Sequence, residues 1–249
     1  MAVLELLSAA GLTQYRLLSA VSIAFSAFLM FINAGNMMAF MSFFSTAYAI
    51  FCFAYLLYRH NTIHISQISY CLMVTLLVTL SFYMLLSIRD RSSAQMGLFY
   101  LLITFGSAWW SDSGAYFAGT FFGKHKLCPG ISPKKTVEGL VGGIVTAVLG
   151  NLLVAWLFLW VSGKLMPVGY FTHHMQVNAT MLALVTPVLS LLGVLGDLSA
   201  SVIKRQHGIK DFGNIMPGHG GVMDRFDSVL FICPAVFLIS RFFPLATIL

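Results

Sequence analysis

Charged residues are scarce in this sequence. Only 9% of its 249 residues are Asp, Glu, Lys or Arg, whereas 59% are hydrophobic, and the mean hydropathy is +0.88. An average soluble domain carries about 25% charged residues, so the composition excludes an ordinary soluble domain and indicates an integral membrane protein. The formal charge of +6 is too thinly spread to indicate a nucleic-acid partner. We therefore expect the lipid bilayer, and no nucleic acid, around this chain.

Three familiar sequence patterns are also missing. The cysteines, Cys52, Cys71, Cys128 and Cys233, form no C-x-x-C pair, so we expect neither a disulfide framework nor a zinc site. There is no G-x-x-x-x-G-K-[ST] segment, which argues against a P-loop nucleotide site. The first residues, M-A-V-L-E-L-L-S, include Glu5 and no basic residue. We therefore expect the first apolar run to be a retained anchor and not a cleaved signal peptide.

Long apolar runs make up most of the chain. A membrane-spanning helix needs about 20 largely apolar residues. The seven runs of this kind lie at about 12–32, 37–58, 68–88, 95–122, 139–162, 178–202 and 228–248. The fourth run is interrupted by S-D-S-G at 111–114, which predicts one long or broken helix.

These runs predict an all-α integral membrane protein, a polytopic helical bundle with about seven transmembrane helices. Residues 1–93 would hold three spans, and residues 94–249 would form a second region of four spans. With seven alternating spans, ten of the 14 Lys and Arg residues fall on the side of the N-terminus. Cytoplasmic loops carry an excess of Lys and Arg, so we expect the N-terminus and the polar segments on its side to face the cytoplasm.

One polar stretch, residues 201–227, interrupts the apolar pattern. It reads S-V-I-K-R-Q-H-G-I-K-D-F-G-N-I-M-P-G-H-G-G-V-M-D-R-F-D and holds four cations, three carboxylates, two histidines and five glycines. Glycines let backbone N–H groups approach phosphate oxygens closely, although most glycine-rich loops are simple turns. Anionic lipid headgroups alone can also account for basic cytoplasmic loops. The mixture of cations, carboxylates and glycines at one place favours a site for phosphate and metal.

Four aspartates are candidate metal ligands. Asp112 and Asp197 fall in apolar runs, where an ionised side chain costs about 2.5 to 3.5 kcal/mol and normally faces a partner or a wet cavity. Asp224 and Asp227 are three residues apart, so a helix would project both from one face. Carboxylate oxygens suit Mg²⁺. The alternative is that Asp112 and Asp197 reach headgroup water, while Asp224 caps a helix and Asp227 interacts with its dipole.

Cations for phosphate and carboxylates for Mg²⁺ are the equipment for phosphoryl or nucleotidyl transfer. His219 would either donate to a phosphate or cap its turn. The residues alone identify only this class of reaction, on a substrate that is reached from the membrane.

The polar stretch resembles the signature of the phosphatidate cytidylyltransferases, also called CDP-diacylglycerol synthases. It matches the pattern S-x-[apolar]-K-R-x4-K-D-x-G-x2-[apolar]-P-x-H-G-G-[apolar]-x-D-R-[apolar]-D, with Met216 where the family more often has Leu, Ile or Phe. Residues 111–116, 123–126 and 132–139 are also similar to the family, as is Gly196-Asp197. The resemblance covers about residues 105–240.

This resemblance implies that CTP and phosphatidate give CDP-diacylglycerol and pyrophosphate, with Mg²⁺, alone or with a second cation, as cofactor. The implied metal ligands are Asp112, Asp197, Asp224 and Asp227. The implied catalytic residues are Lys204, Arg205, Lys210, Asp211, His219 and Arg225. The implied substrate-binding residues are Ser111, Lys124, Ser132, Lys134, Lys135, Ser201, Gly220 and Gly221. The expected partners are CTP, phosphatidate, the bilayer and a second copy of the chain in a homodimer.

Two alternatives stay open at this point. A polyprenol or dolichol kinase, or a cytidylyltransferase for another lipid phosphate, would also need CTP and cations, and the lipid pocket would distinguish them. A membrane transporter would also place carboxylates within spans, but nearer the midplane than these.

Overall fold

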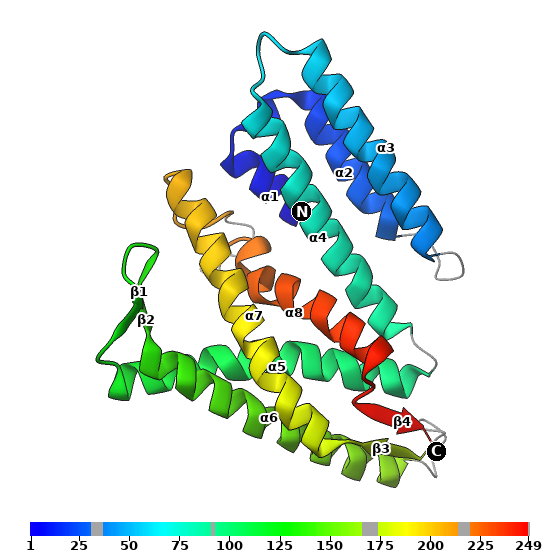
Figure 1. Ribbon diagram of the computed structural model, residues 1–249, viewed down its shortest axis with the longest axis vertical. Helices are drawn as coiled ribbons and strands as arrows, with labels where there is room; N and C mark the ends of the chain where they lie inside the picture. The colour runs from blue at the N-terminus through cyan, green and yellow to red at the C-terminus, as the bar shows by residue number, and fades with distance from the viewer. Residues whose placement is uncertain (31–36, 91–92, 166–173, 214–219, 249) are drawn as a thin grey trace. The chain divides into compact units, whose positions relative to one another are not determined.

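The computed structural model describes residues 1–30, 37–90, 93–165, 174–213 and 220–248 (Figure 1). Most of these residues are helical. The helices are α1 (Ala2–Ala9), the short 3₁₀ helix η1 (Leu12–Gln14), α2 (Arg16–Met30), α3 (Met37–Tyr58), α4 (Ile65–Arg89), α5 (Ala94–Phe122), α6 (Val137–Leu165), α7 (Ala179–Gln206) and α8 (Met223–Phe242). The described strands are β1 (Lys126–Cys128), β2 (Ser132–Thr136), β3 (Met175–Val177) and β4 (Ala246–Ile248).

The predicted apolar runs correspond in order to helices α2 to α8, and the all-α membrane class is confirmed. The fourth run forms one uninterrupted helix of 29 residues, α5. Within the described residues, four helices are long and apolar enough to cross a membrane, namely α3, α4, α6 and α7. Helix α2 is apolar but shorter.

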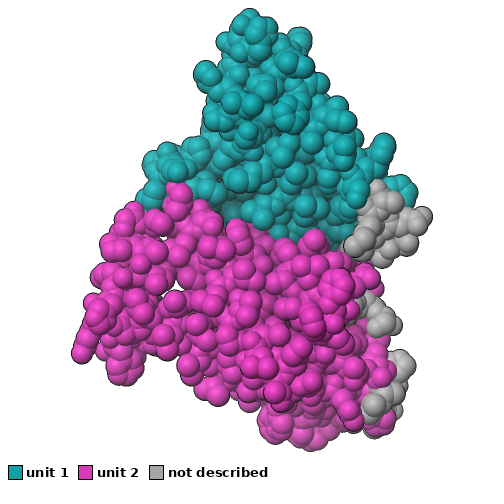
Figure 2. Space-filling view, in the orientation of Figure 1, with its two compact units in different colours: residues 1–83, 203–226 teal, residues 84–202, 227–249 magenta. Residues whose placement is uncertain are grey.

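The chain divides into two compact units, which Figure 2 colours separately. The first unit contains residues 1–83 and 203–226, so it combines the early helices with most of the signature stretch. The second unit contains residues 84–202 and 227–249.

Polar contacts connect the helices of the first unit. The hydroxyl groups of Ser22 in α2 and Tyr48 in α3 lie 2.8 Å apart. The Tyr70 hydroxyl of α4 donates to the carbonyl oxygen of Leu6 in α1 at 3.2 Å. Hydrogen bonds of this kind join helices where lipid offers no polar partner. Helix α1 is thereby tied to a membrane-length helix, and it carries a carboxylate discussed below.

In the second unit, α5 and α6 run antiparallel and side by side (Figure 1). Small residues permit this close approach, since a Cβ added at Gly143 of α6 would lie 2.7 Å from the carbonyl oxygen of Ser111 in α5. The hydroxyl groups of Ser111 and Ser190 lie 2.6 Å apart and join α5 to α7. The packing therefore fixes the part of α5 that carries Asp112.

A second buried contact locks the same three helices. The side-chain amide of Asn151 in α6 donates to the Ser107 hydroxyl of α5 at 2.8 Å and to the Thr186 hydroxyl of α7 at 3.2 Å. All three side chains are fully buried. This contact sets the register of α5, α6 and α7 against one another.

The segment between the fourth and fifth apolar runs contains a hairpin, because β1 and β2 pair in antiparallel fashion. The Glu138 carboxylate, in the first turn of α6, accepts the backbone N–H of Lys124 at 3.1 Å and contacts Nδ1 of His125 at 2.6 Å. The hairpin is thus fastened to the start of α6. Its second strand carries Lys134 and Lys135.

Candidate active site

A cavity of about 250 Å³ lies in the second unit. Its charged lining comes from three segments: Asp112 of α5, Lys134 and Lys135 of β2, and Asp197 of α7. The rest of the lining is Ala115, Tyr116, Leu127, Thr136, Gly139, Leu140 and Val194. The structure therefore brings together four of the residues that the sequence singled out, although the chain separates them widely.

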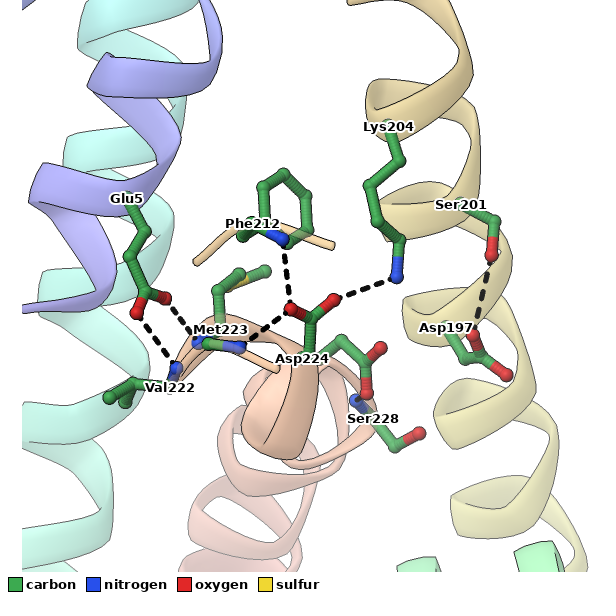
Figure 3. A network of polar contacts seen from close by, with 11 residues as sticks. Glu5, Asp197, Ser201, Lys204, Phe212, Val222, Met223, Asp224 and Ser228 are labelled. Carbon is green, nitrogen blue, oxygen red and sulfur yellow. Dashed lines mark hydrogen bonds and ion pairs between the residues drawn. The ribbon is translucent and has the colours of Figure 1, made fainter. Parts of the chain in front are cut away.

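Asp197 has two side-chain partners at this cavity. The Lys135 ammonium lies 2.6 Å from one of its oxygens, and the Ser201 hydroxyl donates to the other at 3.5 Å (Figure 3 shows the second contact). The side chains of Lys135 and Asp197 are 24% and 31% exposed. Ion pairs that water can reach contribute little to stability, so Lys135 can exchange Asp197 for an incoming phosphate at small cost.

The donor set of the cavity fits a hard cation that also binds substrate. Asp112 and Asp197 supply carboxylate oxygens to the same space, and Mg²⁺ is usually held by one or two carboxylates plus waters and substrate phosphates. Across the described part of the chain, no group of three or more His, Cys, Asp or Glu side chains could hold a metal ion. Two carboxylates would leave the other positions of such a cation for water and substrate phosphate.

The signature stretch begins on helix α7 and ends on helix α8. In the first unit, the Lys204 ammonium lies 2.9 Å from one oxygen of Asp224. The other oxygen of Asp224 accepts the backbone N–H groups of Phe212 at 2.9 Å and Gly221 at 3.0 Å (Figure 3). Asp224 thus fastens three parts of the signature to each other.

These contacts decide the charge state of Asp224. Burial acts to raise the pKa of this carboxyl, but the hydrogen bonds from Lys204, Gly221 and Phe212 outweigh it and hold the pKa below its ordinary value. The carboxylate is therefore ionised at neutral pH. With these three donors it orients Lys204 and closes the turn before α8, and its expected role as a metal ligand stays a prediction.

Gly220 and Gly221 have a local structural reason. Gly220 has φ +80°, which is unfavourable for other residues, and a Cβ there would lie 3.1 Å from an Asp224 oxygen. The N–H of Gly221 donates to the same carboxylate. Gly220 therefore lets the chain turn closely around Asp224, and the backbone of Gly221 adds a hydrogen bond to the same carboxylate.

The sequence pattern of the cytidylyltransferase family matches residues 1–243 of this chain. The chain belongs to the cytidylyltransferase family. The match confirms the resemblance found at 201–227 and extends it to the early helices, which the sequence alone did not relate to the family.

Among its relatives, this cytidylyltransferase is similar to the phosphatidate cytidylyltransferase of Bacillus subtilis, with 40% identity over 183 residues, or 74% of this chain and 62% of that protein. The phosphatidate cytidylyltransferase of Staphylococcus epidermidis is 40% identical over 181 residues, 73% of this chain and 62% of that protein. The phosphatidate cytidylyltransferase of Staphylococcus aureus is 38% identical over 181 residues, again 73% of this chain and 62% of that protein. The matched part thus spans about 62% of the length of these relatives.

Other residues predicted for the site of this cytidylyltransferase lie outside the two clusters just described. Arg205, Lys210, Asp211 and Arg225 are exposed along the signature, and Lys124 is exposed before the hairpin. Ser111 is buried against Ser190, Ser132 is half-buried at the start of β2, and an Asp227 oxygen accepts the backbone N–H of Ser228 at 2.7 Å. His219 lies outside the described residues. The functional roles of these residues stay predictions.

Sequence reasoning missed the part that Glu5 plays beside the signature. Glu5 of α1 is only 5% exposed, and its two oxygens accept the backbone N–H groups of Val222 and Met223 at 2.9 and 2.8 Å (Figure 3). One sequence feature could have indicated this role: Glu5 is the only charged residue in the apolar helix α1. A buried ionised group is costly there unless it has partners.

Proposed function

We propose that this chain transfers CMP from CTP to phosphatidate in a Mg²⁺-dependent reaction, giving CDP-diacylglycerol and pyrophosphate. One structural observation carries the proposal: two carboxylates and two lysines, Asp112, Asp197, Lys134 and Lys135, line a single cavity. That combination suits a reaction between two phosphate groups. The relatives at 38–40% identity, which are named phosphatidate cytidylyltransferases, support the choice of substrates.

The chemistry joins two anions. A phosphate oxygen of phosphatidate attacks the α-phosphorus of CTP, a new P–O bond forms, and the bond from that phosphorus to the bridging oxygen of the β-phosphate breaks. Pyrophosphate carries away the electron pair. The attacking phosphate monoester is already a nucleophile at neutral pH, so the step needs no general base. Its main obstacle is repulsion between the reactants, which cations at fixed positions lower.

The lysines of the hairpin are suited to that task. Lys134 and Lys135 line the cavity, and the Asp197 contact keeps the Lys135 ammonium in place before substrate arrives. Asp224 holds the Lys204 ammonium in one position, so little side-chain entropy would be lost when it binds a phosphate. We assign these three lysines to the phosphates of CTP and phosphatidate, with Arg205, Lys210 and Arg225 as further cations of the signature.

Asp112 and Asp197 would hold the magnesium ion. When bound, Mg²⁺ supplies charge neutralisation at the reacting phosphates. Asp224 and Asp227 remain the proposed source of ligands for a further cation.

Family membership favours the enzyme over the transporter alternative. We propose in addition that the N-terminus and these polar segments face the cytoplasm, where CTP is available, and that the chain works as a homodimer.

Purified protein in mixed micelles with CTP, Mg²⁺ and phosphatidate should release pyrophosphate and form CDP-diacylglycerol. Parallel samples contain polyprenyl phosphate or no lipid phosphate. Absence of both products from folded protein would contradict the proposal. A CDP-linked product formed only from polyprenyl phosphate would identify that lipid, and not phosphatidate, as the acceptor.

A further inference from the structure

A buried carboxylate holds the start of helix α8. We propose that Glu5 is a positioning residue of this enzyme, which fixes the turn from Gly220 to Asp224 by binding the N–H groups of Val222 and Met223 at the start of α8; the inference rests on the proposed function. Its two oxygens accept Val222 N–H at 2.9 Å and Met223 N–H at 2.8 Å. Glu5 belongs to α1, more than two hundred residues away in sequence.

The chemistry of the contact calls for a carboxylate. The first N–H groups of a helix have no partner within the helix, and the helix dipole favours negative charge there. Glutamate offers one oxygen to each of the two N–H groups. Glutamine would offer one oxygen and turn its NH₂ donor toward the other N–H. The partners that the structure gives the Glu5 carboxylate are therefore the backbone N–H groups of Val222 and Met223.

Two signature glycines make room for this carboxylate. A Cβ added at Gly221 would lie 2.7 Å from one Glu5 oxygen, and a Cβ at Gly213 would lie 2.9 Å from the other. Neither glycine has the positive φ that would itself require glycine. The position of Glu5 therefore gives a reason for glycine at both sites that backbone conformation does not.

The Glu5 contact leads directly to the Lys204 pair. Val222 and Met223 connect Gly221, whose N–H donates to Asp224, with Asp224 itself. The turn is thus held by Glu5 through its backbone and by Asp224 through its side chain. If Glu5 releases the turn, Asp224 shifts, and the ammonium of Lys204 shifts with it.

The first test compares Glu5→Gln with Leu4→Gln, which places the same amide one residue away on an exposed position of α1. We expect Glu5→Gln to speed hydrogen exchange at Val222 and Met223 by about tenfold or more. We also expect it to lower kcat for CDP-diacylglycerol formation by about ten- to a hundredfold, with KM for CTP nearly unchanged, because the geometry of the reacting groups is lost. Leu4→Gln should alter neither. Unchanged exchange and kcat in Glu5→Gln would overturn the inference.

A second test uses the close approach of Gly213. Gly213→Ala should reduce kcat by about tenfold in the wild-type background, because the new methyl group displaces the carboxylate. In a Glu5→Ala background, the same change should have less than about a twofold further effect, since interacting positions are not additive. Equal losses in both backgrounds would show that Gly213 does not act through Glu5 and would contradict the inference.

The two proposals fail in different ways. If wild-type protein forms no CDP-diacylglycerol, the proposed function is wrong, and the exchange measurement still tests whether Glu5 holds the turn. If wild-type protein is active and Glu5→Gln matches it in exchange and kcat, the positioning role alone is wrong.

Discussion

The ammonium group of Lys204 lies 2.9 Å from a carboxylate oxygen of Asp224, and the two side chains are only 15% and 10% exposed. Both belong to the stretch that carries the family signature. Asp224 also accepts two backbone N–H groups, but its bond to Lys204 is one in which both groups are charged and little water can replace the lost partner. The contact therefore links the stability of the signature to the position of a proposed phosphate-binding cation.

Lys204→Met and Asp224→Asn should each lower the free energy of unfolding by about 1.5 to 3 kcal/mol, the usual range for a hydrogen bond to a charged group. The double variant should lose clearly less than the sum. Denaturant titration in detergent measures these values. Gln206→Met, an exposed change in the last turn of α7, is the control and should stay within about 0.5 kcal/mol of wild type. Strict additivity of the two changes would show that the pair is not coupled.

Removal of either cavity carboxylate should weaken metal binding. Asp112→Asn and Asp197→Asn are each expected to raise the Mg²⁺ concentration for half-maximal activity by about tenfold or more, since each removes a hard oxygen ligand. Titration with Mn²⁺ followed by electron paramagnetic resonance measures the ion directly. Asp90→Asn, at an exposed position after α4, supplies the control. Wild-type Mn²⁺ affinity in both cavity variants would remove these aspartates from the metal site.

The α5–α6 contact predicts different effects for two glycines of one helix. Gly143→Ala should destabilise the protein by about 1 to 3 kcal/mol because its Cβ would meet the Ser111 carbonyl at 2.7 Å. Gly163→Ala has open space and should be neutral or slightly stabilising, since alanine favours the helix by about 0.5 to 1 kcal/mol. Thermal unfolding in detergent compares them. Equal stability of the two variants would argue against tight packing at Gly143.

Membrane orientation can be read from introduced cysteines. A Cys128→Ser background removes the partly exposed cysteine, and the remaining native cysteines are buried. In this background, Lys134→Cys should react with an impermeant maleimide only after the membrane is opened. Lys164→Cys, placed on the opposite side by the seven-span arrangement, should react in intact spheroplasts. Reaction of Lys134→Cys from outside would reverse the proposed orientation.

The helices could be predicted from the sequence because their apolar character and length are local properties. All seven apolar runs correspond to helices. The polar S-D-S-G segment lies inside continuous α5, where the Ser111 hydroxyl contacts that of Ser190. The short strands were not predicted. Their pairing joins separate segments of the chain, as β3 with β4, which no local sequence pattern indicates.

Sequence analysis singled out side chains that lie close together in the structure, but it did not predict their contacts. Apolar surroundings identified Asp112 and Asp197, and they share a cavity with Lys134 and Lys135. Sequence spacing suggested that Asp224 is a cap or a metal ligand, whereas the folded turn gives it Lys204 and two backbone donors. Glu5 was overlooked because its partners lie more than two hundred residues away.

The most direct measurement follows two labels of CTP in separate reactions with phosphatidate, Mg²⁺ and purified protein. The account predicts that phosphorus from the α-position enters the lipid product, while label from the γ-position leaves as pyrophosphate. Transfer of the γ-label to the lipid would identify a CTP-dependent lipid kinase and contradict the account.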